Sequence, residues 1–128
     1  MILLDSSIII ELFRKTKKEQ TAFYKLVGVY QSLFISSITN YEIGIGNRTI
    51  AQSEYWNKLK QNIEILPFDE SCSEIAKEIY LNLLNQNKII DIADILIGST
   101  ALNYNLPIAT LNVKHFSRIG GLKVINQF

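Results

Sequence analysis

The chain has little of the two side chains that most often bind soft metals or crosslink a protein. Its 128 residues include one cysteine, Cys72, and one histidine, His115. A lone cysteine excludes a disulfide within the chain, and one cysteine with one histidine cannot supply the four ligands of a closed zinc site. Any bound metal must therefore be held by oxygen atoms, and we expect Cys72 to be a small residue of the core.

The sequence also lacks an excess of charge and a long apolar run. Thirteen basic residues against twelve acidic ones leave a formal charge of +1, so binding to nucleic acid or a membrane surface would have to be local. No apolar stretch reaches the roughly 18 residues that a membrane-spanning helix needs. Met1 leads into a strand-like run without a basic leader. We expect a cytoplasmic protein without membrane association, and a single domain over residues 1–128.

Short apolar runs alternate with helical patterns along the chain. Residues 1–4 are typical of a strand buried on both faces, and further strands are expected at 33–38, 63–68, 106–110 and 122–125. Apolar spacing predicts helices at 8–13, 17–29, 39–47, 50–62, 70–85 and 91–103. We expect Ser6 and Ser7 to cap the first helix. The alternation predicts an α/β three-layer sandwich with a mainly parallel central sheet of four to five strands, flanked by helices.

Three acidic residues lie in apolar surroundings at related positions of this fold. Asp5 follows the first strand, Glu42 falls in the first turn of the helix after the second strand, and Asp94 in the first turn of the helix before the fourth. The carboxyl ends of parallel strands and the N-termini of the helices that follow them share one edge of the sheet. We therefore expect these three carboxylates to converge there, beside Thr110 and Asn112 at the end of the fourth strand.

Converging carboxylates repel one another, and a divalent cation compensates them directly. Ligation by oxygen alone favours Mg²⁺ or Mn²⁺, and such a site suits hydrolysis of phosphodiester bonds. The basic run at 14–18, together with Arg48, either forms a solvated face or positions an RNA backbone, with Arg14 and Arg48 as the candidate contacts.

Each acidic residue also has a structural interpretation. Thr39 and Glu42 have the spacing of a capping box, and Asp91 and Asp94 are favourable acids at a helix start. Asp94 fits this interpretation less well, because its neighbours are apolar around most of the helix. Asp5 can cap the helix that follows it. The three acids together favour a functional site more than any one of them does alone.

The neutral polar residues near this edge are open to two interpretations. Ser7 and Thr110 either orient a carboxylate or a bound water, or satisfy backbone groups. Asn112 offers a neutral oxygen or a hydrogen bond to a phosphate. We expect His115 to lie in a surface loop without a catalytic role.

Four stretches of the chain resemble PIN-domain proteins, most closely the VapC-like toxins of toxin–antitoxin pairs. They are LLDSSIII at 2–9, SSITNYEIGIGN at 36–47, DILIGSTALNYNLPIATLN at 94–112, and HF followed by IGGLKVI at 119–125. The resemblance implies a metal-dependent endoribonuclease with Asp5, Glu42 and Asp94 as catalytic acids and metal ligands, and Asp91 as an auxiliary acid. It also implies a homodimer and a small antitoxin whose tail enters the acidic groove.

The chain departs from the family pattern at three positions. Asn112 stands where many members carry a fourth acid, and His115 where another acid often precedes the phenylalanine. Ser7 replaces the usual asparagine and, being shorter, is expected to reach water more readily than the neighbouring carboxylate. The number of metal ions bound is therefore left open.

Two other functions remain as alternatives to RNA hydrolysis. One is a PIN-like module that binds RNA or protein and cuts weakly or not at all, which the missing fourth acid favours. The other is a phosphoacceptor receiver domain with Asp69 as the acceptor. The receiver alternative is weaker, because Asp5-Ser6 lacks the acidic pair of receivers and Asp94 would have no role.

Overall fold

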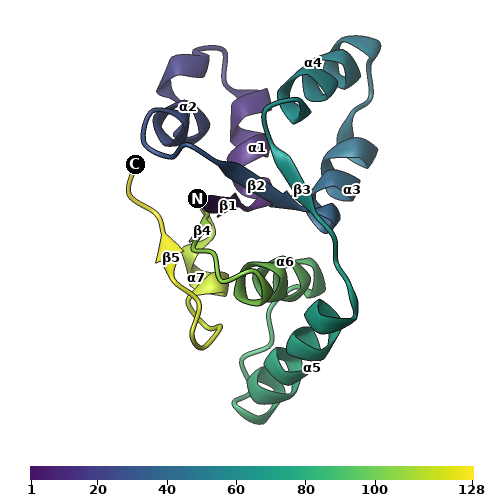
Figure 1. Cartoon of the computed structure of the whole chain (residues 1–128), viewed down its shortest axis with the longest axis vertical. Coiled ribbons are helices and arrows are strands. Elements are labelled where there is room, and N and C mark those ends of the chain that lie inside the picture. The colour runs from purple at the N-terminus through teal and green to yellow at the C-terminus, as the bar shows by residue number, and fades with distance from the viewer.

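The structure, a computed structural model, describes residues 1–128 and is built around one parallel sheet (Figure 1). Its strands are β1 (Ile2–Leu4), β2 (Leu33–Ser36), β3 (Glu64–Leu66), β4 (Ile108–Ala109) and β5 (Val124–Ile125). They lie in the order β3-β2-β1-β4-β5, and every adjacent pair is parallel. The predicted parallel sheet is confirmed with five strands. The strands are shorter than expected, and β3 ends before Pro67, which has no N–H to donate.

Seven helices connect the strands. They are α1 (Ser6–Arg14), α2 (Ala22–Val27), α3 (Ser37–Gly46), α4 (Ile50–Lys60), α5 (Glu70–Asn85), α6 (Ile92–Asn103) and α7 (Val113–Phe116). The expected helix at 17–29 is divided into a 3₁₀ turn and α2, because Thr21 caps α2 through its side chain. Helix α7 was not predicted from the sequence. No helix combines the length and the apolar character needed to cross a bilayer.

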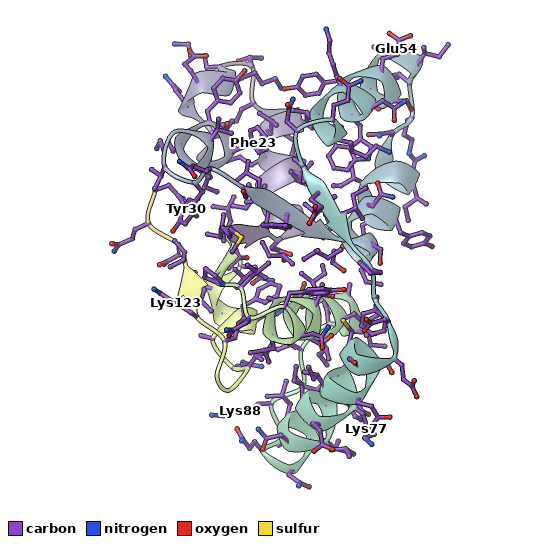
Figure 2. All side chains as sticks on the ribbon, viewed as in Figure 1. Phe23, Tyr30, Glu54, Lys77, Lys88 and Lys123 are labelled. Carbon is purple, nitrogen blue, oxygen red and sulfur yellow. The ribbon has the colours of Figure 1, made fainter.

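Two buried clusters separate the sheet from the helices on its two faces. Ile2 and Leu4 pack with residues of α1, α2 and α4, whereas Leu3 packs with residues of α5, α6 and α7. This alternation follows from the strand period of two and confirms the expected layers. Figure 2 shows Phe23, which is 6% exposed, between α2 and the sheet, and Glu54 and Lys77 on the periphery.

The path of the chain reverses beside β1. The chain runs outward from β1 through β2 to β3, and then crosses back through α5 and α6 to β4 on the other side of β1. In open α/β sheets, ligands bind at the carboxyl ends of the strands where the order reverses. Asp5 directly follows β1 and Thr110 directly follows β4, so both lie at this position.

Candidate active site

Asp5 is held rigidly at the junction of β1 and α1. It is 3% exposed, and it caps α1 by accepting a hydrogen bond from the Ser7 backbone N–H. Its Oδ2 also accepts from Ser7 Oγ at 2.7 Å and from Thr110 Oγ1 at 2.8 Å. The expectation that Ser6 and Ser7 cap α1 is wrong, because Asp5 does so. All of these bonds reach Oδ2, so Oδ1 is left available to a ligand.

Ser7 and Thr110 each orient a carboxylate and also satisfy a backbone N–H, the two roles between which the sequence did not decide. Each hydroxyl donates to Asp5, and each also accepts a backbone hydrogen bond, Ser7 from Leu111 at 3.0 Å and Thr110 from Asn112 at 2.8 Å. The expectation that Ser7 favours water over the carboxylate is wrong, because α1 begins at Ser6 and brings the Ser7 side chain back over Asp5. These contacts fix the rotamer of Asp5.

Glu42 lies on α3, one turn later than expected. The helix begins at Ser37 and is capped by the Ser36 side chain, so Glu42 falls in the second turn. Thr39 is buried inside the helix and cannot be its cap, which excludes the capping-box interpretation of Thr39 and Glu42. Instead, Ser6 Oγ donates to Glu42 Oε1 at 2.6 Å. This role of Ser6 was not predicted, although its position directly after Asp5 was the available signal.

Asp94 lies in the first turn of α6, as predicted, and its side chain is 14% exposed. Asn112 Nδ2 donates to its Oδ2 at 3.2 Å. Burial raises the pKa of the Asp94 carboxyl, a hydrogen bond with His115 lowers it in part, and the negative charge of Asp5 raises it further. Asp5 and Asp94 are therefore electrostatic neighbours, although they lie far apart in the sequence.

His115 belongs to this cluster, contrary to the expectation of a surface loop. It lies on α7, and its Nδ1 is 2.7 Å from Asp94 Oδ2. The next residue, Phe116, is fully buried and anchors α7 in the core. Gly98 leaves room for this packing, since a Cβ added there would lie 2.5 Å from Ile119 Cδ1. The signal in the sequence that could have placed His115 was its position directly before Phe116, where the family pattern often has an acid.

Asp91 occupies the N-cap position of α6, but its side chain makes no capping hydrogen bond. The capping interpretation therefore accounts for its position and not for its carboxylate. One potential ligand atom from each of Asp91, Asp94 and His115 lies within 4.8 Å of the other two. Such spacing allows the three side chains to contact one cation.

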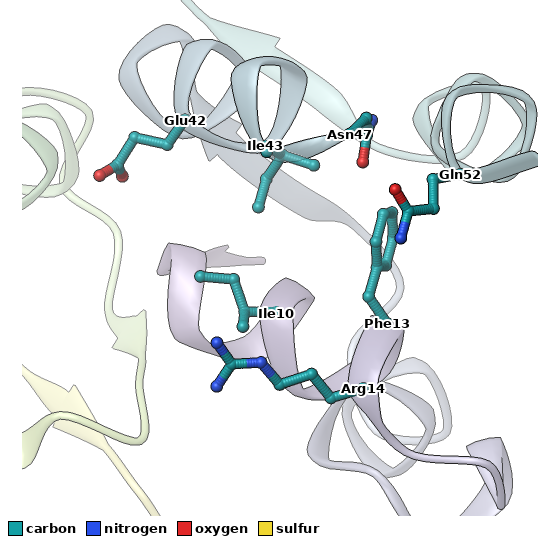
Figure 3. A pocket seen from close by; sticks show the side chains of 8 residues that line it. Ile10, Phe13, Arg14, Glu42, Ile43, Asn47 and Gln52 are labelled. Atoms are coloured by element: carbon teal, nitrogen blue, oxygen red, sulfur yellow. The ribbon is translucent and has the colours of Figure 1, made fainter. Parts of the chain in front are cut away.

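A groove of about 290 Å³ extends from Glu42 along α1 and α3 (Figure 3). It is lined by Ile10, Phe13, Arg14, Glu42, Ile43, Gly46, Asn47 and Gln52. Glu42 lies at one end of the view and Gln52 at the other, with the guanidinium of Arg14 below Ile10. Arg48 does not line this groove, so only one of the two candidate arginines does.

Two residues outside this site have structural roles. Asp69 caps α5 by accepting from the Cys72 backbone N–H at 3.0 Å, and this hydrogen bond lowers the pKa of Asp69. That capping role accounts for Asp69 without the phosphoacceptor function of a receiver domain. Cys72 is fully buried, which confirms its expected place in the core.

Comparisons with known proteins agree with this architecture. A family model described as PIN domain matches residues 2–122. Ribonuclease VapC1 of Methanocaldococcus jannaschii is 30% identical over 98% of this chain and 88% of its own length. Ribonuclease VapC of Rickettsia bellii is 32% identical over 97% of this chain and 94% of its own.

Solved structures give the same assignment. VapBC2 from Rickettsia felis, bound to a DNA fragment from its promoter, superposes with a TM-score of 0.89 at 25% identity over 100% of both chains. VapBC-1 from nontypeable Haemophilus influenzae superposes with a TM-score of 0.84 at 28% identity over 98% of both. The chain therefore belongs to the PIN-domain family, within its VapC-like group.

Proposed function

We propose that this protein is a metal-dependent endoribonuclease that hydrolyses RNA phosphodiester bonds as the toxin of a toxin–antitoxin pair. The observation that carries the proposal is the convergence of the buried Asp5 and the partly buried Asp94 on the segment after β4, where Thr110 donates to Asp5 and Asn112 donates to Asp94. A bound cation would compensate both the repulsion between these carboxylates and the cost of removing their charges from water. The names of the relatives, ribonuclease VapC, supply the substrate class.

The side chains present include the oxygen donors that a hard divalent ion takes, and of the candidate ligands only Asp91, Asp94 and His115 each place an atom within 4.8 Å of the other two. Asp5 presents an oxygen free of hydrogen bonds, and Asp94 and Glu42 supply further carboxylate oxygens, which are the ligands that Mg²⁺ and Mn²⁺ prefer. When bound, such an ion supplies an activated water and neutralises charge on the phosphate. We assign its binding to Asp5, Glu42 and Asp94, with Asp91 as an auxiliary acid.

The surrounding residues orient these ligands. Ser7 and Thr110 fix Asp5, Ser6 fixes Glu42, and Asn112 donates to Asp94. Partners of this kind set the direction of a ligand's lone pairs, and their loss typically weakens metal binding or activity about 10–100-fold. The protein thus holds its acids in place before any substrate arrives.

The groove beside Glu42 is the proposed path of the RNA strand. Arg14 places a positive charge along it, which can contact a phosphate, while Phe13, Ile10 and Ile43 provide apolar surface for a base or ribose. Arg48 is exposed outside the groove, and we assign it at most a peripheral contact.

Solved relatives are VapBC toxin–antitoxin complexes, some of them bound to DNA. We extend this to a cognate antitoxin for the present chain, and we place its action in the cytoplasm, where RNA substrates are available. The homodimer implied by the family resemblance stays a prediction, as does the organisation of residues 1–128 as one domain.

Cleavage of a labelled RNA pool with Mn²⁺ tests the proposal. Asp94→Asn and Asp5→Asn should each lower the rate at least about 100-fold, because each removes a ligand charge. Glu54→Gln, an exposed change on α4, is the matched control and should cleave like the wild type. A wild type that cuts no RNA with any divalent ion would instead favour the non-cleaving PIN-like module, which Asn112 in place of a fourth acid makes the second candidate.

A further inference from the structure

The only histidine of the chain contacts Asp94, although a metal site with oxygen ligands alone needs no imidazole. His115 Nδ1 is 2.7 Å from Asp94 Oδ2 and 3.0 Å from Asn112 Nδ2. Which of these groups donates depends on the tautomer of the ring, and all three polar atoms lie close enough to share one hydrogen-bond network. Without an ion, a proton on Nδ1 joins it to Asp94 Oδ2, and an ion bound at Asp94 would take the place of that proton between the two atoms.

The ring is held in this position by packing. Phe116 and Ile119, on either side of the end of α7, are 0% and 3% exposed and pack against Gly98 of α6. Gly98 lies one helical turn after Asp94, so α7 presents His115 to the first turn of α6. Asp91, which has no capping bond, completes a set whose ligand atoms lie within 4.8 Å of one another.

Two ligand atoms bonded to one ion at right angles, each at about 2.1 Å, lie about 3 Å apart. The observed separation of 2.7 Å between Nδ1 and Oδ2 is close to this spacing. Imidazole nitrogen suits Zn²⁺ and the other later transition metals, Mn²⁺ binds it less tightly, and Mg²⁺ binds oxygen and resists losing its water.

We propose that His115 Nδ1 is a direct ligand of the catalytic ion, beside Asp94, and that it directs the site toward transition metals and away from Mg²⁺. This inference rests on the proposed metal site and deepens it. It replaces the oxygen-only site expected from the sequence with a mixed nitrogen and oxygen set.

Pulsed electron paramagnetic resonance of the Mn²⁺-loaded protein, after removal of any histidine tag, tests the ligand directly. Because the chain has one histidine, an imidazole ¹⁴N coupling can come only from His115. The coupling should be present in the wild type and absent in His115→Asn, which keeps a side-chain donor for Asp94. A wild-type spectrum without nitrogen coupling overturns the proposal.

Metal selectivity supplies a second readout that needs no RNA. Titration calorimetry should show that His115→Asp lowers the preference for Co²⁺ over Mg²⁺ at least about 10-fold, since an oxygen replaces the nitrogen. An unchanged ratio of the two affinities contradicts the inference. Nitrogen coupling in a protein that cuts no RNA would support the ligand and reject the ribonuclease, whereas cleavage without coupling would do the reverse.

Discussion

Among the single side chains, Asp94 is the acidic residue whose ionised form is disfavoured by burial. Its pKa is raised mainly by burial, so in the folded protein the ionised form is disfavoured relative to the unfolded chain. This penalty is fully present above the folded-state pKa, is relieved as the pH falls through it, and is gone below the unfolded value of about 3.9. The metal-free protein is therefore less stable at neutral pH than it would be with an uncharged side chain at position 94.

Asp94→Asn should consequently stabilise the metal-free protein at pH 7. We expect the melting temperature in the presence of a chelator to rise by about 2–6 °C, and the gain to shrink as the pH is lowered toward 4. Thermal denaturation followed by circular dichroism between pH 4 and 8 measures this. A lower melting temperature at pH 7 would mean that the hydrogen bond with His115 outweighs the cost of burying the charge.

Substitution of Thr110 tests how much its hydroxyl contributes to the position of Asp5 and how much it contributes to the stability of the fold. It is fully buried and donates to Asp5 Oδ2, so Thr110→Val removes that bond and leaves the Asn112 N–H without its acceptor. We expect a loss of about 1–3 kcal/mol in the free energy of unfolding and about a 10–100-fold loss in RNA cleavage. Urea denaturation and cleavage rates measure the two effects, and Thr110→Ser, which keeps the hydroxyl, should recover most of both.

Between the helices, the contact of α6 with the segment after α7 depends on Gly98. An alanine Cβ there would lie 2.5 Å from Ile119 Cδ1, and Ile119 is only 3% exposed, so it has little room to move. Gly98→Ala should therefore cost about 1–3 kcal/mol in stability despite the better helix propensity of alanine. Addition of Ile119→Val, which removes Cδ1, should recover part of that loss in a double-mutant cycle measured by urea denaturation.

Gly44 on α3 provides the matched control for this experiment. Nothing lies within 4 Å of a Cβ added at Gly44, so Gly44→Ala should stabilise the protein by about 0.5–1 kcal/mol. Equal effects of the two substitutions would contradict the close approach described at Gly98.

Over the full chain, metal binding and folding should be linked. A ligand that binds only the folded state stabilises it by about 2.7 kcal/mol at 100 times its Kd. We expect Mn²⁺ to raise the melting temperature of the wild type with increasing concentration, and to raise that of Asp5→Asn far less. A similar response of both proteins would place the ion away from Asp5.

Much of the architecture was predictable, because hydrophobic periodicity is a local property. The helix expected at 70–85 has those bounds, and Asp5 and Asp94, which were expected on one edge of the sheet, are close enough for the charge of Asp5 to raise the pKa of Asp94. The contacts of Ser6 with Glu42 and of His115 with Asp94 were not predictable. They depend on how α1 meets α3 and how α7 meets α6, and no local pattern encodes the packing of helices that are distant in the chain.

The hydrogen bond between Asp5 and Thr110 joins residues 105 positions apart. A nascent chain emerging from the ribosome can therefore present all three acids and still lack β4, the Thr110 hydroxyl and the His115 imidazole that orient them. The centre is completed only once β4 and α7 have been synthesised, so the ribonuclease would gain its activity no earlier than that.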